Sequence, residues 1–417
     1  GKYMDDKQCA DWRRRVLLFL TSQCITLFGS TLVQMALVWY AAMETASGGW
    51  VAAFSVCAYL PQFLISFLGG VWADRSPREA LIMGADLLIA LATLAMVLAI
   101  PHISPGTPLL FGLLGMSVIR SLGAGVQTPA VNAVIPQLVP EEHLMRCNGL
   151  NAAMQSMVNF AAPAAAGAVF AVSSLRTTLM IDLVTAVMGN LLLACLTLPG
   201  QRNMGRRTIG EKKDFRLEMK KGIKYTFSDR LLRKLLLLYG ILTFCCVPAG
   251  YLSGLFVRRE FGGTYWYLTA AEVVGFAGMT AGGIVMGVWG GLKRRELTFA
   301  AGLFAFGLLG AGMGLSGNFA LYLGLMFCYG IALTMAQTAL TTMVQEQAEP
   351  SMQGRVFGLM GTMYAGFLPL GMAVFGPLAD VISLRRLMVG AGLALVAIAA
   401  AAGFFRKIRP TSQSGGA

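Results

Sequence analysis

The chain has 417 residues, of which 56% are hydrophobic and only 13% are charged, and its mean hydropathy is +0.66. Soluble domains carry about twice that share of charged residues, so the composition excludes a soluble globular protein and predicts an all-α polytopic membrane protein. The net charge of +13 would also fit a nucleic-acid-binding protein, unless the basic residues have another role.

Twelve apolar segments are each long enough to cross a bilayer as a helix, which takes about 20 residues. They cover residues 15–43, 50–72, 78–100, 108–134, 147–171, 177–199, 231–256, 264–290, 297–315, 319–344, 354–379 and 386–405. We therefore expect a cytoplasmic segment at 1–14, a six-helix bundle at 15–199, a cytoplasmic linker at 200–230, a second six-helix bundle at 231–405 and a cytoplasmic tail at 406–417.

The basic residues are distributed unevenly between the predicted connections. The inner segments carry 27 of the 33, the outer loops carry five, and Arg120 alone lies within a span. This bias follows the positive-inside rule and predicts that both termini are cytoplasmic. No excess of charge remains that would require a nucleic-acid partner.

The two halves share short sequence matches. Gly-Val-Trp at 70–72, followed by Arg-Glu at 78–79, recurs 217 positions later at 287–289 and 295–296. Arg-x-x-Gly-Leu opens segments at 146 and at 355, which are 209 positions apart. Because tryptophan is rare in this chain, the matches indicate an internal repeat.

The connection between the second and third segments is short and charged. Asp74, Arg75 and Arg78 lie in it, and Arg295 lies at the repeated position in the second half. One hypothesis is an inner gate, in which these charges hold neighbouring helix ends together. The alternative is a solvated turn whose arginines only set the topology.

The linker contains a predicted amphipathic helix. Phe215, Met219, Ile223 and Phe227 recur every four residues, with basic residues beside them. This spacing is typical of a helix lying on an anionic membrane surface, although a solvated linker helix would look similar.

Four ionisable residues lie inside predicted spans, where a charge costs about 2.5–3.5 kcal/mol on the most lenient scale. They are Arg120, Asp86, Asp182 and Glu272. Arg120 is expected either to act in transport or to form a structural ion pair with Asp86 or Asp182. Glu272 is a candidate for binding a coupled proton, or a glutamate that simply reaches water.

Polar and aromatic residues within the spans are candidates for a ligand site. The predicted substrate-binding residues are Gln23, Gln34, Trp39, Gln127, Asn132, Gln155, Phe244 and Gln337. Together with the 24 methionines they would form a flexible, mostly apolar wall suited to lipophilic ligands. Each could equally be a packing or lipid-facing residue.

Enzyme and metal signatures are missing from the sequence. The eight cysteines show no Cys-x-x-Cys spacing, and no nucleophile, base and orienting group occur at a recognisable spacing. We expect no catalytic residues, no metal and no cofactor.

The pattern Gly70-x-x-x-Asp74-Arg75-x-x-Arg78 resembles the loop between helices 2 and 3 of major facilitator superfamily transporters. One departure is Pro77, where the family usually has glycine. The resemblance implies a fold of two six-helix bundles.

A second stretch is similar to the macrolide-efflux branch of that superfamily. It comprises Arg120-Ser121 and residues 128–142, Thr-Pro-Ala-Val-Asn-Ala-Val-Ile-Pro-Gln-Leu-Val-Pro-Glu-Glu. Many antiporters of the superfamily have Arg-x-x-Gln-Gly in helix 4. Arg120 matches the arginine, but Gly123-Ala124 replaces Gln-Gly, so the glutamine has no equivalent.

The resemblance implies a monomeric secondary transporter of the bacterial inner membrane that works by alternating access. It would export lipophilic, macrolide-like drugs in exchange for protons, with membrane lipids around it. Alternatives are an exporter of a metabolite such as a siderophore, a lysophospholipid transporter, and a receptor or scaffold that binds its ligand without moving it.

Overall fold

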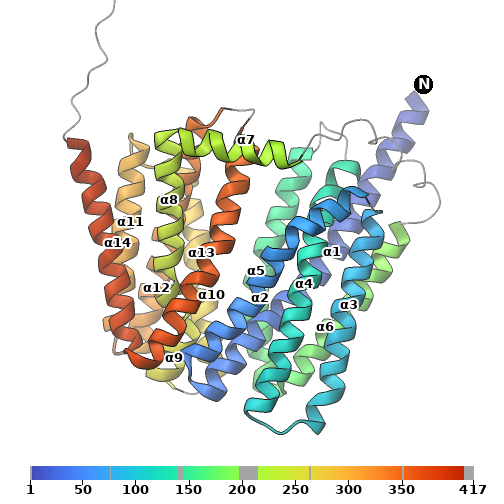
Figure 1. The fold of residues 1–417 in the computed structure, drawn as a ribbon, viewed down its shortest axis with the longest axis horizontal. Coiled ribbons are helices and arrows are strands. Elements are labelled where there is room, and N and C mark those ends of the chain that lie inside the picture. Colours follow the sequence, from blue (N-terminus) through green and yellow to red (C-terminus); the bar gives the residue numbers. More distant parts are fainter. Residues whose placement is uncertain are drawn as a thin grey trace, which may run out of the picture. The chain divides into compact units, whose positions relative to one another are not determined.

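The computed structural model describes residues 2–75, 77–138, 144–196, 215–262, 264–349 and 352–407, and all regular structure in these ranges is helical (Figure 1). By internal contacts the chain divides into two compact units. The first contains Gly1–Ala46 and Trp50–Lys212, and the second contains Ser47–Gly49 and Lys213–Ala417.

The helices follow one another without strands in the described ranges. Those of the first unit are α1 (Lys2–Thr45), α2 (Gly48–Arg75), α3 (Arg78–Ala99), a 3₁₀ turn η1 (Ile100–His102), α4 (Thr107–Leu138), α5 (Leu144–Val172) and α6 (Leu175–Leu196). Those of the second are α7 (Phe215–Ser228), α8 (Arg230–Cys246), a π-helical turn η4 (Val247–Tyr251), α9 (Ser253–Glu260), α10 (Tyr265–Trp289), α11 (Arg295–Leu315), α12 (Phe319–Gln347), α13 (Gln353–Val381) and α14 (Leu384–Lys407).

Eleven helical segments in the described part of the chain are long and apolar enough to cross a membrane. The remaining predicted span lies in α5, whose described apolar segment is the shorter Met157–Val172. The predicted fold class, a polytopic helical membrane protein, is confirmed.

The helix boundaries repeat with the spacing of the sequence matches. Helices α10 and α11 begin 217 residues after α2 and α3, while α13 and α14 begin 209 residues after α5 and α6. The change of offset falls at the connection before α4, which is longer than the connection before α12. The internal repeat is therefore confirmed at the level of secondary structure.

One contact recurs with the same offsets. Arg176 at the start of α6 donates from Nε to the Val97 carbonyl at 3.2 Å, and Arg385 at the start of α14 donates from Nη1 to the Gly314 carbonyl at 3.0 Å. The donors are 209 positions apart and the acceptors 217. We call each contact an arginine clamp, because it satisfies a carbonyl near the end of a helix that has no intrahelical partner.

The clamp of the second unit is the more elaborate. Arg385 also donates to the Ser316 carbonyl at 2.6 Å, pairs with Glu260 at 2.8 Å, and lies 5.2 Å from the ring centroid of Phe256. A neighbouring arginine, Arg259, pairs with Asp380 at 2.9 Å. Arg259 and Arg385, two of the five basic residues predicted in outer loops, therefore form ion pairs within the second unit.

The predicted span at 231–256 falls within one apolar helical segment, Arg230–Glu260, which is long enough to cross a membrane but consists of α8, η4 and α9 instead of one uniform α-helix. Pro248 lies in the break, where its ring nitrogen cannot donate a helical hydrogen bond. The chain widens into a π-turn there, closed by the Leu252 amide on the Val247 carbonyl at 2.9 Å. Such interruptions in membrane helices are tolerated where protein surrounds the freed backbone groups, and Val247, Pro248 and Ala249 are all buried.

Helices α1 and α6 pack very closely. Ser22 Oγ donates to the Gly189 carbonyl at 2.8 Å, and a Cβ on Gly189 would lie 2.2 Å from Thr26 Oγ1. A Cβ on Gly29 would lie 2.0 Å from Thr185 Oγ1. Small residues allow this approach, as is common between membrane helices, and the contact fixes which face of α1 turns away from α6.

Candidate functional site: a polar cavity and buried charges

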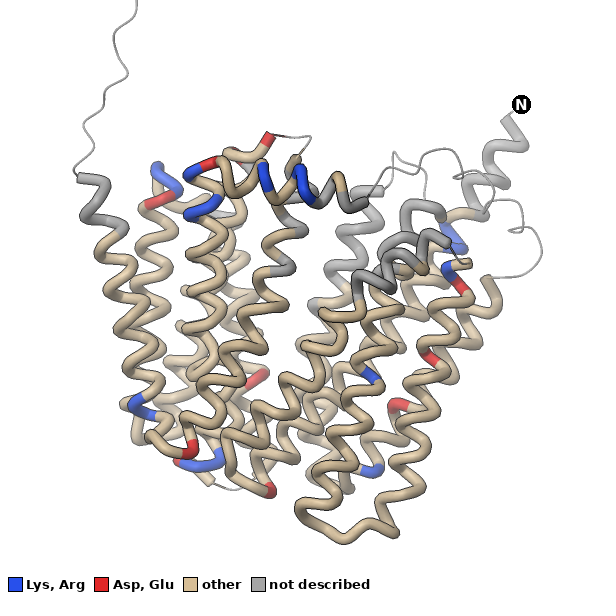
Figure 2. Tube along the Cα trace, viewed as in Figure 1, with Lys and Arg blue, Asp and Glu red and all other residues tan. Residues whose placement is uncertain are grey.

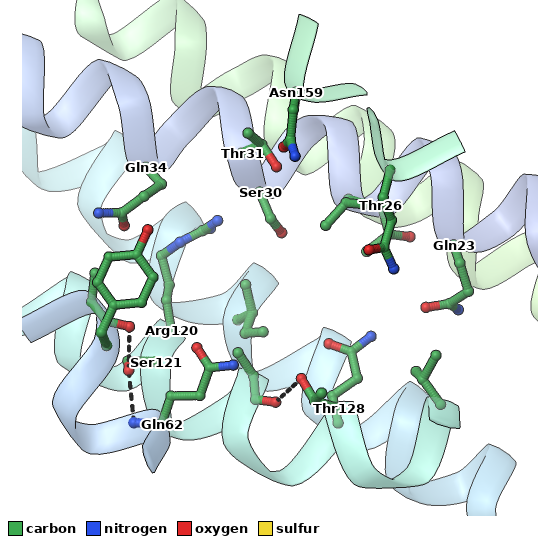
Figure 3. Close-up of a pocket in the computed structure, with 18 of the residues that line it drawn as sticks. Gln23, Thr26, Ser30, Thr31, Gln34, Gln62, Arg120, Ser121, Thr128 and Asn159 are labelled. Atoms are coloured by element: carbon green, nitrogen blue, oxygen red, sulfur yellow. Dashed lines mark hydrogen bonds between the residues drawn. The ribbon is translucent and has the colours of Figure 1, made fainter. Parts of the chain in front are cut away.

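A cavity of about 410 Å³ lies within the first unit, between faces of α1, α2, α4 and α5 (Figure 3). Most of its lining residues have polar side chains, although more of the wall surface is apolar than polar. The polar side chains are Gln23, Thr26, Ser30, Thr31, Gln34, Tyr59, Gln62, Ser117, Arg120, Ser121, Gln127, Thr128, Gln155 and Asn159. The volume is within the range of small-molecule sites.

Helix α1 contributes a polar stripe. Gln23, Ser30 and Gln34 are separated by seven and four residues, so they share one face of the helix. Ser22 lies on the face packed against α6. Nε2 of Gln23 is buried, and in the described part of the chain it has no hydrogen-bond partner. A buried unpaired donor beside a cavity is available to an acceptor on a ligand.

Helix α4 contributes the opposing stripe, and it is joined to α2 by Ser121. The Ser121 hydroxyl donates to the Ala58 carbonyl at 2.7 Å and accepts from the Gln62 amide at 2.9 Å (Figure 3). In a regular helix that amide would bond to that carbonyl, four residues earlier. The hydroxyl is therefore inserted between two backbone groups of α2 that would otherwise bond to each other, next to Pro61. Such an insertion of a side chain is a recognised cause of helix kinks.

Arg120 lies at the cavity wall and joins three helices. Its Nη1 donates to Asp182 Oδ2 of α6 at 2.6 Å and to Thr93 Oγ1 of α3 at 2.7 Å. The side chains of Arg120 and Asp182 are only 11% and 4% exposed. Of the two carboxylates considered as partners for Arg120, the structure selects Asp182.

Asp86 has a different partner. Nε2 of Gln127 donates to Asp86 Oδ1 at 2.8 Å, and both side chains are buried. Gln127 therefore lines the cavity and also satisfies a carboxyl group of α3.

Four of the predicted substrate-binding residues line this cavity: Gln23, Gln34, Gln127 and Gln155. Trp39 does not, because it is packed in the core of the first unit, 3% exposed. The Asn132 side chain lies outside the described residues. Phe244 and Gln337 belong to the second unit, where the Phe244 ring lies 5.0 Å from that of Phe375.

The expected methionine-rich wall is not what surrounds this cavity. Met154 is the one methionine among the described lining residues, and most of the others carry a hydroxyl or an amide group. Sequence reasoning missed Ser30 and Thr31, although their helical spacing from Gln23 and Gln34 was a signal that could have found them. Tyr59 and Gln62 carried no such signal, since their place at the cavity depends on how α2 meets α4 at Ser121.

Glu272 lies in α10 of the second unit. Its Oε1 accepts a 3.3 Å hydrogen bond from Ser253 Oγ of α9, directly after the π-turn. No cation pairs with it within the described residues. Tyr322 of α12 is fully buried, and its hydroxyl has no partner in the same part of the structure.

The predicted inner gate is only partly visible. The side chains of Asp74 and Arg75 lie outside the described residues, and Arg78 begins α3 after Pro77, whose φ of −57° is normal for proline. Arg295 pairs with Glu346 at 2.5 Å, with the two side chains 48% and 55% exposed. An exposed pair of this kind contributes about 0–1 kcal/mol, so it holds α11 to α12 only weakly.

Comparison with known proteins gives consistent results. The family model described as Major Facilitator Superfamily matches residues 19–371. Macrolide efflux protein A of Streptococcus pyogenes is 28% identical over 96% of this chain and 98% of its own. Macrolide efflux protein A of Enterococcus faecalis is 30% identical over 77% of this chain and 98% of its own.

Solved structures share the fold at low sequence identity. A bacterial homologue of the iron transporter ferroportin, in an inward-facing state, superimposes with a TM-score of 0.70 at 17% identity, covering 93% of this chain and 98% of that one. A bacterial homologue of the human lysosomal transporter Spinster gives 0.69 at 14% identity, covering 96% and 99%. Taken with the repeat and the helical architecture, these matches show that the chain belongs to the Major Facilitator Superfamily of transporters and resembles its macrolide efflux proteins.

Proposed function

We propose that this transporter exports lipophilic, macrolide-like drugs from the bacterial cytoplasm by alternating access, in exchange for protons. The observation that carries the proposal is the full-length similarity to two macrolide efflux proteins, each covered over 98% of its length. The protein would act as a monomer in the inner membrane with both termini in the cytoplasm, as the distribution of its basic residues favours.

The polar cavity supports a binding role for the first unit. Its amide and hydroxyl groups suit a ligand that carries many oxygen atoms, while Leu27, Ile89 and Val131 provide apolar contact. Arg120 also lines the cavity, but its charge is already balanced by Asp182. The site therefore favours a neutral face of the substrate over an anionic one.

Glu272 is the best candidate for the coupled proton. Asp182 is paired with Arg120 and Asp86 accepts from Gln127, whereas Glu272 accepts from a serine hydroxyl. An ionised carboxylate without a cation is costly among apolar helices. Glu272 would therefore bind a proton when it is shielded from water and release the proton when water reaches it.

The inner gate stays part of the proposal. Asp74, Arg75 and Arg78, with Arg295 in the second half, would hold helix ends together when the cytoplasmic side is closed. Asp74→Ala should then change the transport rate more than the ligand affinity.

The decisive experiment uses purified protein in liposomes with an imposed pH gradient and an internal pH indicator. Addition of a macrolide should move protons in the parent. Glu272→Gln should abolish that movement, while Glu44→Gln, at an exposed glutamate of α1, should not. Drug flux without proton movement would disprove the coupling, and drug binding without flux would favour a receptor.

A further inference from the structure

A groove of about 260 Å³ runs along one face of α8 in the second unit. It is lined by Arg230, Arg233, Lys234, Leu237, Leu238 and Ile241. The spacing of three and four residues places all six on one side of the helix. The opposite side carries the buried residues Leu232, Leu235 and Leu242, so the groove face is the one left uncovered in the described structure.

The upper half of the groove is strongly basic. Arg230, Arg233 and Lys234 occupy the first turns of α8, and all three are exposed. Cations are unfavourable at a helix N-terminus, where the helix dipole is positive, unless an anion is nearby. In the described part of the chain none of the three pairs with a carboxylate, and the one contact is from Arg233 Nη1 to the Phe227 carbonyl at 3.4 Å.

The acidic neighbour of this cluster is already engaged. Asp229 caps α8, with Oδ1 accepting from the Leu231 and Leu232 amides at 2.9 and 3.1 Å, and Oδ2 accepting from Gln347 at 3.0 Å. It offsets one of the three positive charges, which leaves a net excess of two at the groove.

The lower half of the groove is apolar and uncovered. Leu237 is 46% exposed and Ile241 is 39% exposed, directly below the cations along the helix axis. A free phosphate or other small anion would leave this stripe unused. A ligand with an anionic head and a hydrocarbon chain would use both halves.

The adjoining helix α7 adds charge of the same sign. Lys220, Lys221 and Lys224 are exposed on it, and Figure 2 shows basic residues gathered where α7 meets α8. The α7–α8 corner is fixed to the end of α12, because the Glu349 amide donates to the Tyr225 hydroxyl at 3.0 Å. The cations are thus held in place at the end of a membrane helix.

We infer that the α8 groove binds an anionic phospholipid, with the phosphate at Arg230, Arg233 and Lys234 and an acyl chain along Leu237 and Ile241. Basic pockets at the ends of membrane helices bind such head groups, each cation near the surface contributing about 1 kcal/mol. Removing two cations should therefore weaken binding about 30-fold.

The test compares two doubly substituted proteins with the same loss of charge. Arg233→Gln with Lys234→Gln removes two of the three groove cations. Lys293→Gln with Arg294→Gln removes two exposed cations from the turn before α11. Native mass spectrometry in detergent, with dioleoyl phosphatidylglycerol titrated in, counts the bound lipid. Thermal unfolding midpoints without added lipid should match across the three proteins.

The expected result is one lipid that the parent and the turn variant retain, and that the groove variant loses. Equal losses in both variants would show non-specific attraction and overturn the site. Displacement of the lipid by inorganic phosphate, or equal binding of a water-soluble glycerophosphoglycerol, would make it a free-anion site instead. Equal retention of phosphatidylcholine would remove the requirement for negative charge.

Discussion

The two units share a helical frame but fill matching positions with opposite chemistry. With the offset of 209, Arg120 of the first unit corresponds to Tyr329 of the second, and Asp182 corresponds to Ala391. Arg120 makes a buried ion pair, whereas Tyr329 stacks on Phe306 with ring centroids 4.2 Å apart. The frame therefore accepts either an ion pair or aromatic packing at this place.

The reverse asymmetry holds at Glu272. Its counterpart at the offset of 217 is Ser55, and the counterpart of Tyr322 at the offset of 209 is Leu113. Each unit thus carries a buried ionisable side chain that the other lacks at the matching position. Because the same helical frame forms in the unit that lacks each side chain, the frame itself does not require these charges.

The largest expected effect comes from removing only the arginine of the buried Arg120–Asp182 ion pair. Arg120→Leu leaves Asp182 buried without its cation, and this should lower the free energy of unfolding by about 3–5 kcal/mol. Arg120→Tyr with Asp182→Ala reproduces the pair of the second unit and should recover most of that loss while transport stays impaired. Thermal unfolding in detergent measures the stability of each variant, and flux in liposomes measures its transport. A double variant as unstable as the single would show that folding requires the ion pair.

The arginine clamps should differ in strength. Arg385→Ala removes bonds to two carbonyls and to Glu260, and hydrogen bonds to charged groups contribute about 1.5–3 kcal/mol, so we expect a loss of about 2–3 kcal/mol. Arg176→Ala removes one longer bond and should cost about 1 kcal/mol. The measurement is the unfolding midpoint of each variant. Equal losses would mean that the extra contacts of Arg385 contribute nothing.

Close packing also distinguishes the units. A Cβ on Gly392 of α14 would lie 2.4 Å from the Gly307 carbonyl, whereas the corresponding position in α6 is Leu183. Gly392→Ala should therefore destabilise the protein by about 1–3 kcal/mol through overpacking. Gly84→Ala in α3 is the control, since its Cβ would meet nothing within 4 Å, and it should be neutral or slightly stabilising. Similar midpoints for the two variants would contradict the close approach of α11 and α14.

The smallest effect concerns Asp229, the residue that caps the N-terminus of α8. Partial burial alone raises the pKa of Asp229, but hydrogen bonds from Gln347 and the Leu232 and Leu231 amides outweigh it and hold the pKa below 3.8. A lowered pKa stabilises the fold above the unfolded value, and this contribution is lost as the pH falls through the folded value.

Asp229→Ala should accordingly cost about 1 kcal/mol near neutral pH and less in acid. The control is Asn318→Ala, because Asn318 caps α12 through the Ala320 amide at 2.8 Å without a titrating group. Its cost should not vary with pH. If both losses varied alike between pH 3 and 7, the carboxylate of Asp229 would not be their source.

Much of the fold was predictable from the sequence, because hydrophobic length and the repeated Gly-Val-Trp place the spans within a few residues. The π-turn at Pro248 was not predicted, because a sequence does not reveal how the chain rearranges around a proline inside a span. The roles of the site residues were harder to predict. The choice of Asp182 over Asp86 depends on which face of α6 meets α4, and Gln127 was assigned to substrate binding alone although it also serves Asp86.

The paired arginine clamps also bear on the ancestry of the chain. Arg176 and Arg385 meet corresponding carbonyls, so the contact belongs to the ancestral half-length sequence that was duplicated. The Arg120–Asp182 pair and Glu272 occur in one half each, so the two halves have diverged at these positions. The halves thus share the contacts that close the helix ends and differ in the charges that they bury.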